Sequence, residues 1–192
     1  MTPIPLLNSR HAERSRKTDE SAMLHLMRHV FALTLLLFLC GCPPTATTTP
    51  VLINELQSSN QLTIADEAGE FDDWIELYNP ATNDEDISGF YLSDDTINPT
   101  RWIFPADSVV PAEGYLVVWC DGDTGQGPLH TGFKLSAGGE EIGFYGPAEE
   151  YYSLVDRIEF NPMDADTSLG RSPDGGPDLI TFDEPTPGEA NQ

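Results

Sequence analysis

The chain has 192 residues, and its 32 acidic side chains outnumber the nine basic ones to give a formal net charge of −23. Nucleic-acid binding depends on cationic side chains that displace counterions from phosphates, so this charge excludes DNA and RNA as expected partners. The same repulsion disfavours direct adsorption to an anionic membrane surface. The length suits one domain with a sizeable core.

The N-terminal part carries an apolar run over residues 30–39, followed by Cys40, Gly41 and Cys42. A membrane-spanning helix needs about 20 apolar residues, and this shorter run has the length of the hydrophobic region of a signal peptide. Residues 39–42, LCGC, resemble a bacterial lipobox. That resemblance implies cleavage after Gly41 and lipidation of Cys42, with Cys40 leaving in the leader. An ordinary secretory leader with a chance cysteine is the alternative.

Residues 1–41 are therefore predicted to be a leader. Residues 1–26 are polar and of mixed charge, unlike the start of a signal peptide, so we expect the true start at Met23 or Met27 and assign no function to what precedes it. Without this leader, 29 acidic and four basic residues remain. Pro43, rather than an aspartate, follows the lipidation site, which favours the outer membrane or the cell surface of a bacterium.

Residues 42–50 form a predicted spacer. The segment PPTATTTP after Cys42 has no apolar area to bury and is typical of an extended linker. At about 3 Å per residue it would hold a domain roughly 25 Å from a membrane. We therefore expect a lipid-anchored protein of the cell envelope, with its folded domain at residues 51–192.

No long stretch after residue 50 shows helical periodicity. Short runs rich in β-branched and aromatic residues are separated by Gly, Pro, Asn and Asp, which is the pattern of an all-β sandwich. In WIELY (74–78) the alternation places Ile75 and Leu77 on one, inward face. The run GYLVVWC (114–120) is apolar nearly throughout and is predicted to be a central strand. The predicted strands are 51–57, 74–80, 86–94, 100–105, 114–120, 141–146 and 154–160.

The motifs of these segments follow one another in a recognisable order. They are LINELQSSN, DDWIELYNP, DISGFYLSDD, RWIFP, GYLVVWCD, LHTGFKLSAGGEEIGFY, VDRIEF, SLGRSPDG and TPGEAN. This order resembles that of the bacterial lamin-tail domain family, and the resemblance covers residues 51–192. It implies an immunoglobulin-like β-sandwich. It also implies an interaction module without catalysis, as in the nuclear lamins, of a kind that occurs on secreted and surface proteins in bacteria.

Few residues of the predicted domain could support catalysis. His130 is its one histidine, Ser136 follows six residues later, and no GxSxG nucleophile turn is present. Cys120 ends an apolar strand without a cationic neighbour in the sequence, so we expect it to pack as a small apolar residue. One histidine and one cysteine are too few for a usual zinc site. Arg171 is expected to pair with a carboxylate.

Calcium is the metal that this composition favours, because calcium takes six to eight carboxylate and carbonyl oxygens. A strongly acidic domain also repels itself, and a bound cation would relieve that repulsion. For each candidate group the alternative is a solvated acidic loop. The candidates are Glu55 with Asp72, Asp73 and Glu76, on strands expected to be neighbours; Asp94 with Asp95; and Asp121 with Asp123 and Thr124 in a glycine-containing loop.

The favoured function is a lipid-anchored, non-catalytic domain at the cell surface or in the periplasm that binds a protein or a glycan, with calcium stabilising it. The alternative is a carboxylate-dependent hydrolase of an envelope or extracellular polymer, which requires paired carboxylates in a cleft, one of them with a raised pKa. A third hypothesis is a coat component that associates through sheet edges.

Overall fold

The structure, a computed structural model, describes residues 49–147 and 152–191. Within these ranges the chain forms strands, turns and loops, and it contains no helix long and apolar enough to cross a membrane. Cys42 and the predicted leader lie outside the described residues. The strands are β1 (Leu52–Gln57), β2 (Trp74–Tyr78), β3 (Glu85–Asp86), β4 (Tyr91–Ser93), β5 (Trp102–Ile103), β6 (Val109–Val110), β7 (Tyr115–Trp119), β8 (Glu140–Gly146), β9 (Ser153–Phe160), β10 (Ser168–Arg171) and β11 (Leu179–Phe182).

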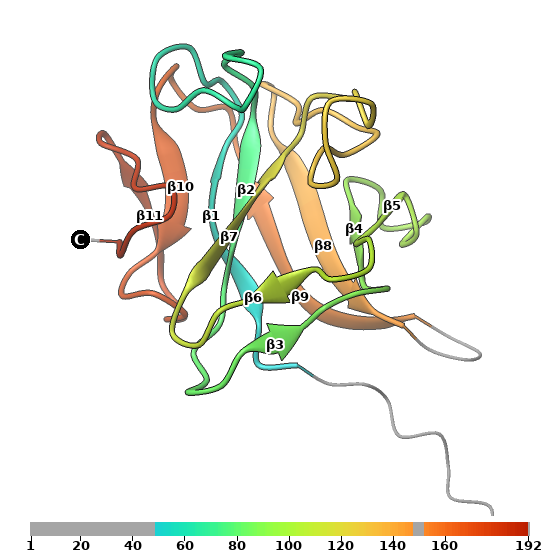
Figure 1. Ribbon diagram of the computed structural model, residues 1–192. Helices are drawn as coiled ribbons and strands as arrows, with labels where there is room; N and C mark the ends of the chain where they lie inside the picture. The colour runs from blue at the N-terminus through green and yellow to red at the C-terminus, as the bar shows by residue number, and fades with distance from the viewer. Residues whose placement is uncertain (1–48, 148–151, 192) are drawn as a thin grey trace, which may run out of the picture. The chain divides into compact units, whose positions relative to one another are not determined.

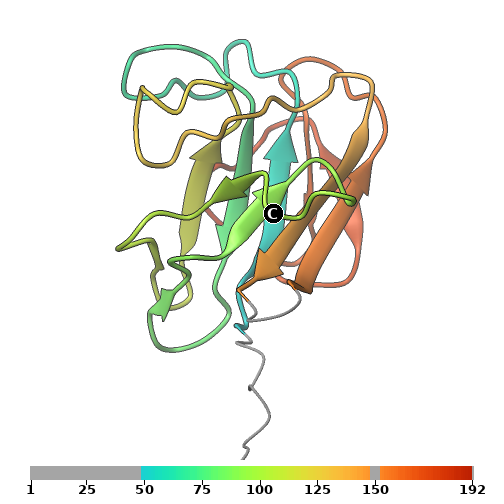
Figure 2. The ribbon, with the colours of Figure 1, turned by 90° about the vertical axis from the view of Figure 1, so that its right-hand side faces the viewer.

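The strands form two larger antiparallel sheets and one short pair. The first sheet has five strands in the order β11-β10-β1-β2-β7, the second has four in the order β5-β4-β8-β9, and β3 pairs with β6. The two larger sheets are the layers of a sandwich (Figures 1 and 2). Each sheet buries one apolar face against the other, so the predicted all-β sandwich is confirmed.

The main core lies between these two sheets. Ile75 and Leu77 of β2 are fully buried in it, as the alternation predicts, and the opposite sheet contributes Ile142 and Phe144 of β8. Burying one such side chain stabilises the fold by about 1.5–3 kcal/mol. Cys120 is also buried in this core as a free thiol, which confirms its prediction as an apolar packing residue.

An ion pair connects the two sheets. Arg171 of β10 donates from Nη2 to both carboxylate oxygens of Asp156 in β9, at 3.0 and 2.9 Å. The same Asp156 Oδ2 accepts a hydrogen bond from the backbone N–H of Ile53 in β1 at 2.9 Å. Arg171 also donates from Nε to the carbonyl oxygen of Ile53 at 2.7 Å. The predicted carboxylate partner of Arg171 is therefore Asp156, and the ionised groups make this a charge-assisted hydrogen bond.

Strand β7 differs from its prediction, because it lies at the edge of the five-stranded sheet and pairs with β2 alone. Residues 115–117 are accordingly half-buried, whereas the end of the strand is buried. The chain beyond it folds back along this edge: Trp119 N donates to Leu129 O, and Thr131 N donates to Trp119 O, both at 2.8 Å. An apolar run did not distinguish a central strand from an edge strand that a loop covers.

Two loops lie side by side at one end of the sandwich, residues 58–73 between β1 and β2 and residues 120–135 after β7 (Figures 1 and 2). Gln126 Nε2 donates to Glu70 Oε2 at 2.6 Å and joins the two. We call these two segments the distal loops, because the described chain starts with residue 49 at the opposite end of the sandwich (Figure 1).

Candidate functional site

Glu55 and Glu76 are neighbours, as the sequence predicts. A register shift between Ile53 and Glu55 places Glu55 opposite Glu76 in the antiparallel pair of β1 and β2. Because successive side chains of a strand face opposite sides, Glu76 lies on the face away from Ile75 and Leu77. That face is not exposed, since both glutamates are fully buried.

The segment that follows β11 supplies hydrogen-bond donors to both glutamates. Thr186 donates from its backbone N to Glu55 Oε1 at 3.1 Å and from its hydroxyl to Glu55 Oε2 at 3.0 Å. The hydroxyl of Ser168 in β10 also donates to Glu55. Gly188 N donates to Glu76 Oε2 at 2.6 Å. These bonds hold the C-terminal segment on the outer face of the five-stranded sheet.

Asp174 extends this network. The amide of Asn54 donates to Glu76 Oε1 at 3.0 Å and to Asp174 Oδ1 at 2.9 Å. The hydroxyl of Tyr115 donates to Asp174 Oδ2 at 2.7 Å, and Asn191 N donates to Asp174 Oδ1 at 3.1 Å. We call Glu55, Glu76 and Asp174 the carboxylate network. It joins strands β1, β2 and β7 to the SLGRSPDG and TPGEAN motifs of the sequence.

Burial controls the ionisation of this network. It raises the pKa of Glu76 to about 8, although the hydrogen bonds from Asn54 and Gly188 act in the opposite direction. Burial also raises the pKa of Glu55. A raised glutamate pKa suits a general acid, but such an acid must reach its substrate, and both side chains are fully buried. Every carboxylate oxygen of the two accepts a hydrogen bond, so the arrangement suits a structural role.

The other members of the first two predicted groups lie elsewhere. Asp73 stands just before β2, where its Oδ1 lies 3.4 Å from Asn60 N and burial raises its pKa to about 6. Asp94 forms an ion pair with Arg101 at 3.2 Å. Asp95 Oδ1 accepts a hydrogen bond from the backbone N–H two residues further on, at 2.9 Å. The described contacts of these three acids are thus local, and calcium binding at them stays a prediction.

The third predicted group shapes the second of the distal loops. Asp121 Oδ1 accepts a hydrogen bond from Asp123 N at 2.8 Å, and Asp123 Oδ1 accepts one from Gly125 N at 3.0 Å. The other oxygen of Asp121 lies 2.5 Å from His130 Nδ1. The predicted acids therefore hold the loop that carries the histidine, and their calcium binding likewise stays a prediction.

His130 is buried between two carboxylates. Besides its contact with Asp121, its Nε2 lies 3.2 Å from Glu67 Oε1. Burial lowers the pKa of His130, but the hydrogen bonds and charges of Asp121 and Glu67 outweigh burial, and the pKa is raised. Ser136 Oγ accepts a hydrogen bond from Gly138 N at 3.2 Å. The described residues thus show no pair of serine and histidine that could form a nucleophile.

A group of acids that sequence reasoning mostly missed lies next to His130. The segment DEAGEFDD (66–73) carries five acids, and of these only Asp72 and Asp73 were predicted as ligands. In the structure, one oxygen from each of Asp66, Glu70 and Asp72 lies within 4.8 Å of the others. Burial, followed by the charges of Asp121, Asp66 and Glu70, raises the pKa of Asp72. The density of acids in this segment was the available signal.

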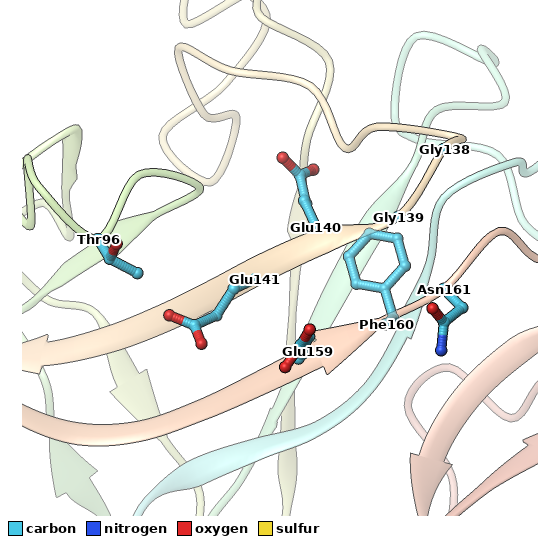
Figure 3. A pocket seen from close by; sticks show the side chains of 8 residues that line it. All are labelled: Thr96, Gly138, Gly139, Glu140, Glu141, Glu159, Phe160 and Asn161. Carbon is cyan, nitrogen blue, oxygen red and sulfur yellow. The ribbon is translucent and has the colours of Figure 1, made fainter.

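A pocket of about 450 Å³ lies beside the start of β8 and the end of β9 (Figure 3). Glu140 and Glu141 point to different sides of β8 (Figure 3). Glu140 accepts a hydrogen bond from Ser136 N at 2.6 Å, and burial raises its pKa. Glu141 pairs with Arg157 at 3.1 Å and lies opposite Glu159. The acid with the raised pKa thus faces away from the other two, unlike the catalytic pair that a hydrolase requires.

The distal loops also expose apolar side chains. Leu62 is 78% exposed and Phe71 is 46% exposed, both within residues 58–73. Both lie on loops at one end of the sandwich, and loops on a rigid scaffold carry a large share of binding functions.

Two antiparallel sheets around one core, with a buried polar network on the outer face of one sheet, define an immunoglobulin-like β-sandwich. The chain belongs to the Lamin Tail Domain family, whose model matches residues 44–161. This confirms the resemblance that the motifs indicate, and it places β1 to β9 and the distal loops inside the matched region. No curated protein and no solved structure matches the chain.

Proposed function

We propose that the chain is a lipid-anchored, non-catalytic interaction domain of a bacterial cell envelope, located at the outer membrane or the cell surface. It binds a protein or a glycan through its distal loops, and calcium stabilises it. The observation that carries this proposal is the exposure of Leu62 and Phe71 at the end of the sandwich opposite residue 49. A chain anchored at Cys42 enters the domain at one end and presents these side chains at the other.

The anchor is tested by metabolic labelling of the full chain with a radioactive fatty acid in a bacterial host. We expect Cys42→Ser to abolish the label and to leave the precursor uncleaved. Cys40→Ser is the matched control, because Cys40 leaves with the leader when cleavage follows Gly41. Equal labelling of the wild-type chain and the Cys42→Ser variant would refute the anchor.

The binding surface is tested by saturation binding of the purified chain to isolated cell envelopes. We expect the double variant Leu62→Ser, Phe71→Ser to weaken binding at least tenfold, which corresponds to about 1.4 kcal/mol. Leu154→Ser is the matched control, because Leu154 is 50% exposed on β9, outside the distal loops. Equal loss in the control, or binding that does not saturate, would contradict the proposal.

A further inference from the structure

We propose that the distal loops hold one calcium ion, with Asp66, Glu70 and Asp72 as its carboxylate ligands. This inference locates the calcium part of the proposed function and is independent of the lipid anchor and of the binding partner. One oxygen from each of the three acids lies within 4.8 Å of the others. Calcium binds oxygens at about 2.3–2.6 Å, so two oxygens on one ion lie at most about 5 Å apart.

The second observation is independent of this spacing and concerns hydrogen bonding. Asp66 is only 8% exposed. Its Oδ1 accepts hydrogen bonds from Ala68 N at 2.9 Å and from Glu70 N at 2.8 Å, whereas its Oδ2 is buried without any partner. Asp72 Oδ2 is likewise buried without a hydrogen-bond partner. A buried carboxylate oxygen without a donor is costly, and a cation removes that cost.

The second loop contributes a neutral oxygen without a hydrogen-bond partner, on a side chain that contacts Glu70. The amide of Gln126 donates from Nε2 to Glu70 Oε2, and its own Oε1 is buried without a hydrogen-bond partner. Of the five such buried side-chain atoms among the described residues, three belong to Asp66, Asp72 and Gln126. Carboxylates combined with a neutral amide oxygen form the hard oxygen set that calcium prefers. The ion would join residues 58–73 to residues 120–135.

The positive charge near these acids is insufficient to neutralise them. None of Asp66, Glu70 and Asp72 takes part in an ion pair among the described residues, whereas Arg101, Arg157 and Arg171 are paired with other acids. The charge of Lys134 lowers the pKa of Asp72, but burial and the charges of Asp121, Asp66 and Glu70 outweigh it. Like charges a few ångströms apart destabilise the loop that carries them. A divalent cation supplies the missing charge at the point where the unpartnered oxygens lie.

A transition-metal site is the competing arrangement, because atoms of Asp66, Glu67 and His130 also lie within 4.8 Å of one another. Both ring nitrogens of His130 already have partners, Asp121 at 2.5 Å and Glu67 at 3.2 Å. The atoms without hydrogen-bond partners in Asp66, Asp72 and Gln126 are all oxygens. Hard oxygen ligands select calcium over zinc or copper, which prefer imidazole and thiolate. His130 therefore holds the loop through Asp121 and Glu67, and the oxygens without partners bind the ion.

The experiment is thermal unfolding of the chelator-treated full chain in mild detergent, with calcium, magnesium or zinc chloride added at equal ionic strength. Calcium at about 100 times its dissociation constant is expected to raise the melting temperature by roughly 5–10 °C. Asp72→Asn should abolish this shift. It should also raise the melting temperature of the calcium-free chain, because it removes a negative charge that burial and the charges of Asp121, Asp66 and Glu70 disfavour.

The matched control is Glu67→Gln, which removes the same charge from the same loop but belongs only to the competing group. It should retain the full calcium shift. The proposal would be overturned if calcium gave no shift, or if zinc or magnesium gave the same shift. It would also be overturned if the shift were lost in Glu67→Gln or retained in Asp72→Asn. Fatty-acid labelling of Cys42 and binding to envelopes are read separately, so failure here is distinguishable from failure of the proposed function.

Discussion

Replacing Thr186 with valine tests whether the carboxylate network stabilises the domain. The substitution preserves the shape of the side chain and removes its hydroxyl, whose one proton is shared between Asn191 Oδ1 at 2.8 Å and Glu55 Oε2 at 3.0 Å. No other described residue donates to that oxygen, so the variant leaves a buried carboxylate oxygen without a partner. A hydrogen bond to a charged group contributes about 1.5–3 kcal/mol. For a domain of this size that loss lowers the melting temperature by roughly 3–12 °C.

The assay is thermal unfolding at pH 5 and pH 8. Thr181→Val is the matched control, because Thr181 is exposed on β11 and the same chemical change there should cost under about 0.5 kcal/mol. The hydroxyl of Thr186 favours the ionised form of Glu55, so the loss should be larger at pH 8 than at pH 5. If the two variants melt within 1 °C of each other at about the wild-type temperature, the network does not stabilise the fold.

Three further predictions concern other parts of the domain. The pKa of Glu76 is raised to about 8 by burial, so the folded chain retains a proton that the unfolded chain releases above about pH 4.5. Stability should therefore fall as pH rises from 5 to 8, by on the order of 4 kcal/mol, and a flat profile in urea unfolding would contradict this. Trp74→Phe removes the hydrogen bond from the indole N–H to Gln57 Oε1 at 2.7 Å. It should lower the free energy of unfolding by about 1–2 kcal/mol, measured as a lower denaturant midpoint, and an unchanged midpoint would show that the bond contributes nothing. Gly139→Ala should destabilise by at least about 2 kcal/mol, because Gly139 has φ +86° and an added Cβ would collide with backbone of β9 and the residue after it. Gly138→Ala is its control, since a Cβ there meets only a serine oxygen at 3.5 Å, and equal melting temperatures would refute the reasoning.

The strands and the inward residues could be predicted because they depend on local alternation. Ile75 and Leu77 face the core as the strand period requires. That Glu55 and Glu76 lie on neighbouring strands was also predicted, but their exact pairing depends on a register shift after Ile53 that alternation does not show. The burial of Glu76 could not be predicted in this way. It depends on a segment more than a hundred residues away that covers the outer face of the sheet, and alternation alone assigns that face to solvent.

The group formed by Asp66, Glu70 and Asp72 in the distal loops was only partly predictable, for a related reason. The sequence shows that residues 66–73 are acidic, but ligand geometry depends on how an irregular loop turns. Asp66 closes that loop by accepting hydrogen bonds from Ala68 N and Glu70 N, which brings Glu70 and Asp72 toward it. Gln126 arrives from a loop that folds back along β7, and the predicted central position of β7 gave no reason to expect it.

The two acidic groups of this domain differ in how their carboxylate oxygens are stabilised. In the carboxylate network each oxygen of Glu55 and Glu76 receives an N–H or O–H donor, and burial raises the pKa of both acids. In the distal loops Asp66 and Asp72 retain buried oxygens without donors. Because the first group is satisfied by the chain itself, its stabilising effect should not respond to chelator. The second group needs an external positive charge, so a calcium-dependent melting shift should vanish with Asp72→Asn and persist with Thr186→Val.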